Sequence, residues 1–123
     1  MPIISILVAA ALTSCTAIDG DTLRCRGERV RLIGIDAPEM PGHCRRGRVC
    51  VEGDPIAAKR HLDRLVRGRD VKLTRHGRDH YGRTLAYAEV GGIDLSCEMI
   101  ASRFAVYVEK WDRRSQLQRC ESR

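Results

Sequence analysis

Apolar residues alternate with polar ones in short runs, and turn-forming residues separate these runs. Such alternation is typical of strands that bury one face. The expected strands cover residues 13–18, 22–26, 29–35, 71–74 and 84–90. Asp19-Gly20-Asp21 and Arg26-Gly27-Glu28 supply turns between the first three runs, which predicts a three-stranded meander.

After the third run the apolar spacing becomes helical. Asp54 is a suitable N-cap, Pro55 suits the first helical position, and Gly68 ends the pattern. A second short helix is expected over residues 95–102 with Asp94 as its N-cap, and the charged tail 111–123 has a weak helical pattern.

The predicted order is therefore three strands, a helix, two strands and further helices. This order fits a mainly β fold, namely a small, closed, five-stranded barrel of the OB type with two to three α-helices. The spacing of apolar residues alone also permits an open α+β sheet.

The chain of 123 residues has the size of one domain, and 43% hydrophobic with 31% charged residues excludes disordered and membrane-embedded classes. We expect a single domain over residues 13–123. The apolar run in residues 1–12 predicts a signal peptide or its remnant, too short to span a bilayer, with a first strand as the alternative. A secreted or periplasmic protein with no membrane span is therefore expected.

Six cysteines are many for this length, and none lies in a Cys-x-x-Cys pair, which argues against zinc. The simplest set of disulfides joins neighbours in sequence: Cys15–Cys25, Cys44–Cys50 and Cys97–Cys120. In the first hairpin, centred on Gly20, Cys15 and Cys25 would face each other. The alternative to these disulfides is six free thiols. A lower-ranked alternative is a lipoprotein that is anchored through Cys15.

The formal net charge of +6 favours an anionic partner, either nucleic acid or a lipid surface. Basic residues gather in the loop before the first helix and near the fourth strand: Arg45, Arg46, Arg48, Arg67, Arg69, Lys72, Arg75 and Arg78. They would follow a polyanion backbone, or else form a solvated face. Aromatic residues are only 4% of the chain, so little base readout is expected.

Chemistry-bearing residues stand where expected strands begin or end, at Asp21, Asp36, Glu39 and Arg83. Two converging carboxylates make a hard-oxygen site for Ca²⁺ or Mg²⁺, and a third carboxylate nearby can take a proton from water. An arginine can neutralise the charge that develops on a phosphate. The set suits phosphodiester hydrolysis, although each residue taken singly also suits a turn or a structural ion pair.

Three segments carry a resemblance to a known family: residues 17–23 (AIDGDTL), 30–39 (VRLIGIDAPE) and 79–87 (DHYGRTLAY). Their order and separations resemble those of the staphylococcal nuclease-like, or thermonuclease, family, over about residues 13–108. The resemblance implies an OB barrel with a calcium-dependent nuclease site that acts on DNA and RNA, mainly single-stranded, as a monomer.

The resemblance also assigns roles to individual positions. Asp21 and Asp36 would bind Ca²⁺ through their side chains, and Ala37 through its main-chain carbonyl. Glu39 would position or deprotonate the attacking water. The remaining residues would bind phosphate or nucleotide: Arg31 and Arg83 at the reacting phosphate, and His80, Tyr81 and Tyr107 around it.

Two features depart from the simple pattern. Arg31 and Asp36 are five residues apart, so a regular strand would point them to opposite faces unless a bulge or a bend near Gly34 intervenes. The loop with Cys44 and Cys50 would be stiffer than the family's flexible loop.

A non-catalytic OB module that binds nucleic acid is the alternative function, and it has no need of Glu39 beside a metal site.

Overall fold

The computed structural model describes residues 12–121, and the expected signal segment 1–12 lies almost entirely outside them. The main strands are β2 (Cys15–Asp19), β3 (Thr22–Cys25), β4 (Glu28–Leu32), β6 (Val71–Arg78) and β7 (Thr84–Val90). Short strands are β1 (Leu12–Thr13), β5 (Ile35–Asp36), β8 (Ile93–Asp94) and β9 (Val106–Tyr107). The helices are α1 (Pro55–Val66), α2 (Leu95–Ala101), the 3₁₀ turn η1 (Glu109–Trp111) and α3 (Gln118–Glu121).

Seven of these strands form one mixed sheet in the order β1-β6-β7-β4-β3-β2, with β8 added beside β7. β4 and β7 run parallel and join the meander to the β6–β7 hairpin. The expected OB-type architecture is confirmed. The expectation of a closed barrel is wrong, because the sheet is not closed. β1 and β2 lie at its two ends, although only Ser14 separates them in the chain. One stretch of backbone thus supplies both edges, pairing first with β6 and then with β3.

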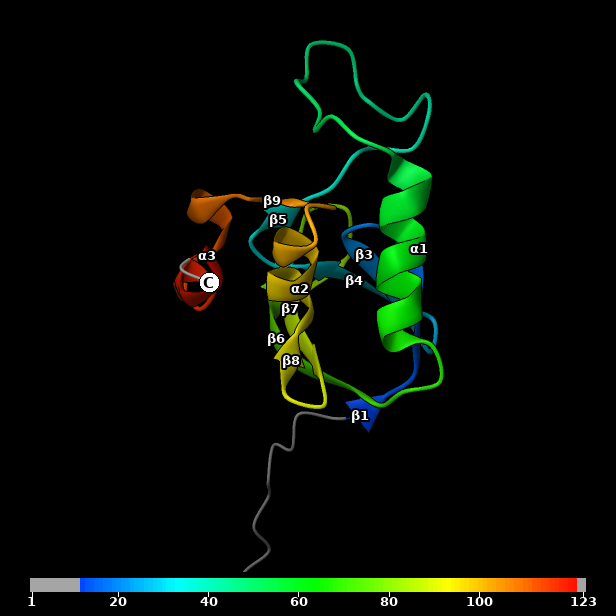
Figure 1. Ribbon diagram of the computed structural model, residues 1–123, viewed down its shortest axis with the longest axis vertical. Helices are drawn as coiled ribbons and strands as arrows, with labels where there is room; N and C mark the ends of the chain where they lie inside the picture. The colour runs from blue at the N-terminus through cyan, green and yellow to red at the C-terminus, as the bar shows by residue number, and fades with distance from the viewer. Residues whose placement is uncertain (1–11, 122–123) are drawn as a thin grey trace, which may run out of the picture.

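Both predicted helix starts are confirmed. Asp54 accepts hydrogen bonds from the N–H groups of Ile56 and Ala57, and Asp94 accepts one from Cys97. α1 runs along one side of the sheet, and α2 lies beside β7 and β8 (Figure 1). No helix among residues 12–121 combines the length and apolar character that a bilayer crossing requires.

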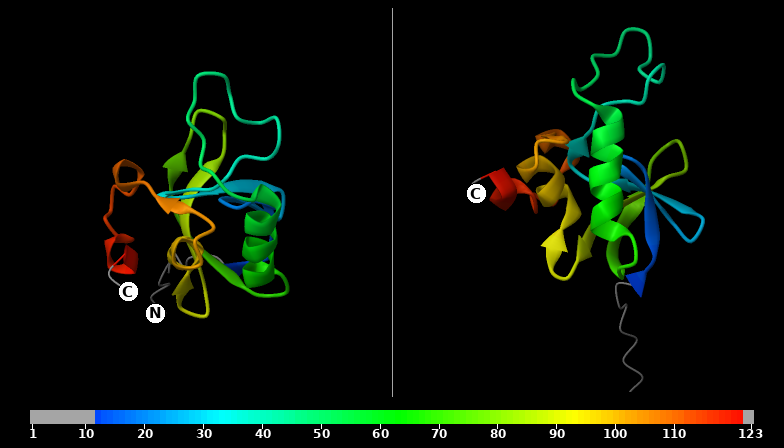
Figure 2. Two further views of the ribbon diagram at one scale, coloured as in Figure 1. Left: turned by 45° about the horizontal axis from the view of Figure 1, so that its top comes forward. Right: turned by 45° about the vertical axis from the view of Figure 1, so that its right-hand side comes forward.

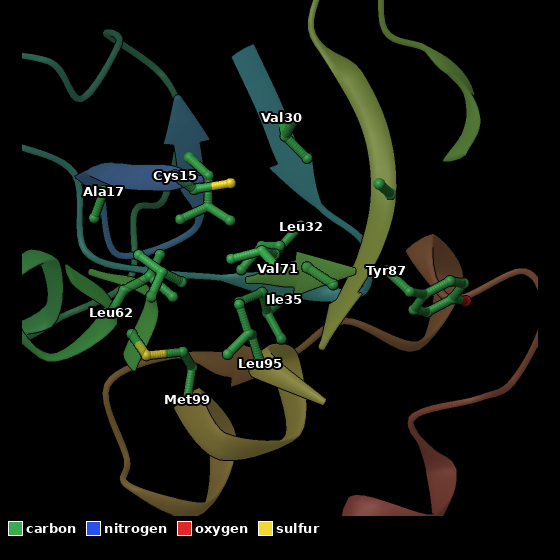
Figure 3. Close-up of a cluster of buried hydrophobic side chains, with 14 of the residues drawn as sticks. Cys15, Ala17, Val30, Leu32, Ile35, Leu62, Val71, Tyr87, Leu95 and Met99 are labelled. Carbon is green, nitrogen blue, oxygen red and sulfur yellow. The ribbon is translucent and has the colours of Figure 1, made fainter. Parts of the chain in front are cut away.

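The core lies between the curved sheet and the two main helices (Figure 3). Leu62 of α1 and Met99 of α2 are fully buried and converge with Leu32 of β4. A hydrogen bond of 3.0 Å from the Ala17 N–H to Asp63 Oδ1 ties β2 to α1. The core therefore rests on aliphatic side chains, as the scarcity of aromatic residues requires.

All three expected disulfides are present: Cys15–Cys25, Cys44–Cys50 and Cys97–Cys120. Cys15 pairs directly with Cys25 across the β2–β3 ladder, with their Cα atoms 4.1 Å apart. This pairing is the one that a hairpin centred on Gly20 predicts.

The C-terminal segment is docked on the sheet through one buried carboxylate. Asp112 accepts hydrogen bonds from the Tyr87 hydroxyl, the Tyr107 hydroxyl (2.8 Å) and the Leu117 N–H (3.0 Å). Leu117 is fully buried, and Cys120 attaches the segment to α2. The segment from η1 to α3 is therefore part of the packed body.

Candidate active site

A turn at Ile33 and Gly34 interrupts the strand expected over residues 29–35. Gly34 has a φ of +82°, a conformation that favours glycine, and β4 ends at Leu32 while β5 begins at Ile35. The turn brings the Arg31 guanidinium to 3.4 Å from Asp21 Oδ2 and 3.6 Å from Asp36 Oδ1. The bend near Gly34 that the sequence requires is therefore present.

Arg31 is held rigidly in this position. Its Nη1 donates to the carbonyl oxygens of Leu32 (3.0 Å) and Ile35 (2.9 Å), which belong to the same turn. On the other side the guanidinium lies 5.5 Å from the centre of the Trp111 ring. These contacts leave Nη2 directed at the two carboxylates.

Asp21 and Asp36 form the acidic centre, and their side chains are only 10% and 11% exposed. Asp21 accepts hydrogen bonds from the Thr22 hydroxyl (3.1 Å) and the Ala37 N–H (2.9 Å). Burial and the neighbouring Asp21 raise the pKa of Asp36, while nearby arginines act in the opposite sense. Burial and the neighbouring Asp21 also raise the pKa of Asp19 to about 7, because its charged form is poorly solvated and lies close to a second carboxylate.

The donor set fits a hard divalent cation. In the range 12–121, no cluster of three or more His, Cys, Asp or Glu side chains could hold a metal by itself. Two carboxylates supplemented by main-chain carbonyls and water match the oxygen preference of Ca²⁺. Asp21 and Asp36 are the side chains that would hold it, and the adjacent Ala37 carbonyl is the main-chain candidate.

Glu39 lies beyond Asp36 and is bound by an arginine from the following loop. Arg48 Nη1 is 3.1 Å from Glu39 Oε1, and its Nη2 is 3.2 Å from Asp36 Oδ2. The basic composition of the loop predicted contact with a polyanion for Arg48, whereas the structure places it on the two carboxylates. Three of the basic residues grouped with it by sequence are also in ion pairs: Arg67, Lys72 and Arg75.

The tip of the β6–β7 hairpin supplies the second arginine. Asp79 Oδ2 accepts from Arg83 Nε at 2.7 Å, and Asp79 Oδ1 accepts the N–H groups of Tyr81 and Arg83. Burial alone would raise the pKa of Asp79, but these hydrogen bonds lower it. Among the described residues, the two terminal nitrogens of Arg83 make no hydrogen bond or ion pair, and the guanidinium lies 5.3 Å from the Tyr81 ring centre.

These groups face one cavity of about 1100 Å³. It is lined by seven of the predicted site residues: Asp21, Arg31, Asp36, Glu39, His80, Tyr81 and Arg83. The loop between β5 and α1 and the β6–β7 tip rise on the same side of the molecule (Figure 2, left). Residues from four separate parts of the chain therefore meet at one place.

Two predicted residues, Ala37 and Tyr107, lie outside this lining. Tyr107 lines a neighbouring hollow that shares Val108 and Lys110 with the cavity, and its hydroxyl is bound to Asp112. Arg48, expected from the sequence only as a polyanion-binding or solvated residue, also lines the cavity, and sequence reasoning missed five further lining residues: His76, Lys110, Trp111, Arg113 and Arg114. The run of basic residues around the single tryptophan was the available signal for the last four.

The fold and the cavity together define an OB-type protein with an acidic centre flanked by arginines. A family model described as staphylococcal nuclease homologue matches residues 29–123. The chain is also 34% identical over 92 residues to a Haemophilus influenzae protein described as an uncharacterized endonuclease. That match covers 71% of this chain and 46% of the relative, so the chain spans about half of the relative's length. The chain belongs to the staphylococcal nuclease homologue family.

Proposed function

We propose that this protein is a Ca²⁺-dependent nuclease that hydrolyses phosphodiester bonds of DNA and RNA, mainly in single strands. The observation that carries the proposal is the gathering of Asp21, Asp36 and Glu39 with Arg31 and Arg83 around one cavity. A module that only binds nucleic acid has no use for a carboxylate triad facing two arginines.

Each of these side chains has a role in an in-line displacement. Asp21 and Asp36 would hold Ca²⁺, which would supply positive charge to offset the charge on the phosphate and to acidify the attacking water. Glu39 accepts a proton from that water as the water oxygen bonds to phosphorus, and the phosphorus–oxygen ester bond breaks with the leaving oxygen protonated from solvent. Arg31 and Arg83 donate to the equatorial oxygens, where negative charge accumulates in the transition state.

Residues at the rim hold the flanking nucleotides. Tyr81 is 42% exposed, and its ring lies beside the His80 ring, with centroids 3.9 Å apart. The pair offers one stacking surface and one hydrogen-bonding ring to a neighbouring nucleotide, and Tyr107 shapes the adjoining hollow. Stacking accepts every base, so we expect little sequence preference.

The chain acts as one monomeric domain over residues 13–123 in an oxidising compartment, either outside the cell or in the periplasm. Three disulfides support this location, because such bridges persist where thiols are not kept reduced. The Cys15 sulfur is bonded to Cys25, which favours a structural role over a lipid anchor.

Cleavage of a single-stranded DNA oligonucleotide and of a matched RNA tests the proposal. With Ca²⁺ present we expect cleavage that a chelator abolishes and that Glu39→Gln slows by about 10²–10⁴-fold, since the proton acceptor is lost. Glu52→Gln, an exposed change in the same loop, is the control and should leave the rate unchanged.

Two results would refute the nuclease. One is cleavage that ignores both chelation and Glu39→Gln. The other is tight oligonucleotide binding with no cleavage under any condition, which would identify a binding module.

A further inference from the structure

The loop between β5 and α1 carries a small covalent ring directly beside the acidic centre. The Cys44–Cys50 bond closes this ring of residues 44–50, which we call the disulfide loop. Inside it the Arg48 N–H donates to the Arg45 carbonyl at 3.0 Å, and Gly47 adopts a φ of +84°. The disulfide and this turn restrict where the Arg48 side chain can reach.

The disulfide loop contacts the cavity at two points. The Arg45 guanidinium lies 5.0 Å from the Tyr81 ring centre at the hairpin tip. Arg48 bridges Asp36 and Glu39 on the opposite side, with distances of 3.2 Å and 3.1 Å. The loop therefore lies across the cavity entrance, with one arginine on each side.

Arg48 occupies the oxygen atoms that a divalent cation needs. Its Nη2 lies within 3.4 Å of both oxygens of Asp36, while Arg31 is already near Oδ1. Ca²⁺ binds carboxylate oxygens at about 2.3–2.6 Å, which would put the ion and the guanidinium in the same space. The other arm of Arg48 binds the carboxylate that would accept the proton of water.

We propose that Arg48 is a built-in competitor of the metal ion, and that the disulfide loop keeps it close to Asp36 and Glu39. The inference rests on the proposed function, because it concerns the same cation site. Binding of the ion requires Arg48 to leave, so the apparent affinity equals the intrinsic affinity multiplied by the fraction of molecules in which Arg48 is disengaged.

Calorimetric titration with Ca²⁺, without nucleic acid, tests the competition. We expect Arg48→Gln to tighten binding by about tenfold, the combined effect when the two ion pairs to Asp36 and Glu39 no longer have to be broken. Arg48→Lys keeps the charge but cannot bridge both carboxylates with a planar fork, so its affinity should lie in between.

The loop's own contribution is measured with Cys44→Ser/Cys50→Ser. Opening the ring lowers the effective concentration of Arg48 at the carboxylates, so we expect Ca²⁺ binding to tighten by about threefold. Arg46→Gln is the matched control, since it removes one charge from an exposed position of the same loop with no contact to Asp36 or Glu39. It should stay within about twofold of the unmodified protein.

The outcomes separate this inference from the proposed function. Equal Ca²⁺ affinity in Arg48→Gln and Arg46→Gln would overturn the competition and leave the nuclease intact. Weaker oligonucleotide binding by Arg48→Gln with unchanged Ca²⁺ affinity would make Arg48 a phosphate ligand instead. Failure of every variant to bind Ca²⁺ would overturn both proposals.

Discussion

The carboxylate of Asp79 orients Arg83. Asp79 accepts the Arg83 Nε at 2.7 Å and also binds two backbone N–H groups of the same turn. One edge of the guanidinium is thereby used for positioning, and the edge with the two terminal nitrogens is presented to the cavity. This division suits a residue that must meet two phosphate oxygens at once.

We predict that Arg83→Lys lowers kcat by about 10²-fold, because an ammonium group has neither the fork nor the Asp79 contact that aims it. Steady-state cleavage of the oligonucleotide in Ca²⁺ measures the effect. Arg24→Lys, an exposed change on β3, is the control. An equal loss of kcat in both variants, or no loss in either, would show that Arg83 does not stabilise the transition state.

The strands are joined across the sheet by one acidic residue. Glu28 at the start of β4 binds Arg75 of β6 at 2.7 Å and 3.0 Å, and it accepts the Thr84 hydroxyl of β7 at 2.7 Å. The Arg75 hydrogen bond lowers the pKa of Glu28 to about 2, although partial burial acts in the opposite sense. The ion pair thus links the meander to the hairpin that carries Arg83.

We predict that Glu28→Gln destabilises the fold by about 1 kcal/mol at pH 7, a value discounted for the solvent exposure of both partners. A carboxylate with a lowered pKa stabilises the folded state above its unfolded pKa, near 4.5, and this contribution is lost as the pH falls through about 2.

Urea unfolding of both proteins between pH 7 and pH 2 measures this difference. The difference in free energy of unfolding between the two proteins should begin to narrow below about pH 4.5 and should vanish near pH 2. A gap that stays constant down to pH 2 would show that Glu28 acts by packing alone.

Element boundaries show where local patterns suffice. Both N-caps and the Gly20 hairpin are set by neighbouring residues, and the structure confirms them. The strand expected over residues 29–35 is instead broken at Gly34, because β5 pairs with β9, more than seventy residues later. β6 likewise continues to Arg78, since β7 offers a partner along that length.

At the scale of the whole molecule, the C-terminal segment completes the cavity. Residues from Val108 to Arg114 form one wall of the cavity, and Asp112 and the Cys97–Cys120 bond attach that wall to the sheet and α2. Trp111 lies in this wall and is the single tryptophan, so its emission reports on the docking of the segment.

We predict that Cys97→Ala/Cys120→Ala lowers the free energy of unfolding by about 3 kcal/mol, since it removes the constraint on the intervening loop. The Trp111 emission should then change at lower denaturant than the far-ultraviolet circular dichroism, because the wall undocks first. In the unmodified protein the two transitions should coincide. Coincident transitions in the variant would mean that Asp112 alone holds the segment.

Local rules of backbone and spacing were enough to predict the helix starts and the Cys15–Cys25 hairpin, because each depends on residues close together in sequence. The other two disulfides followed from the simplest pairing of neighbouring cysteines, and the OB-type fold from the resemblance of three segments to a family. The family segments also marked seven residues that the structure gathers around one cavity. The placement of Arg48 on Asp36 and Glu39, the binding of Tyr107 to Asp112, and the cavity wall around Trp111 depend on folding. In the first two cases the partners are only five to twelve residues apart, but the loop conformation that brings them together is decided by packing against distant parts of the chain. Trp111 meets Arg31 from the other end of the chain, and no local pattern specifies that contact.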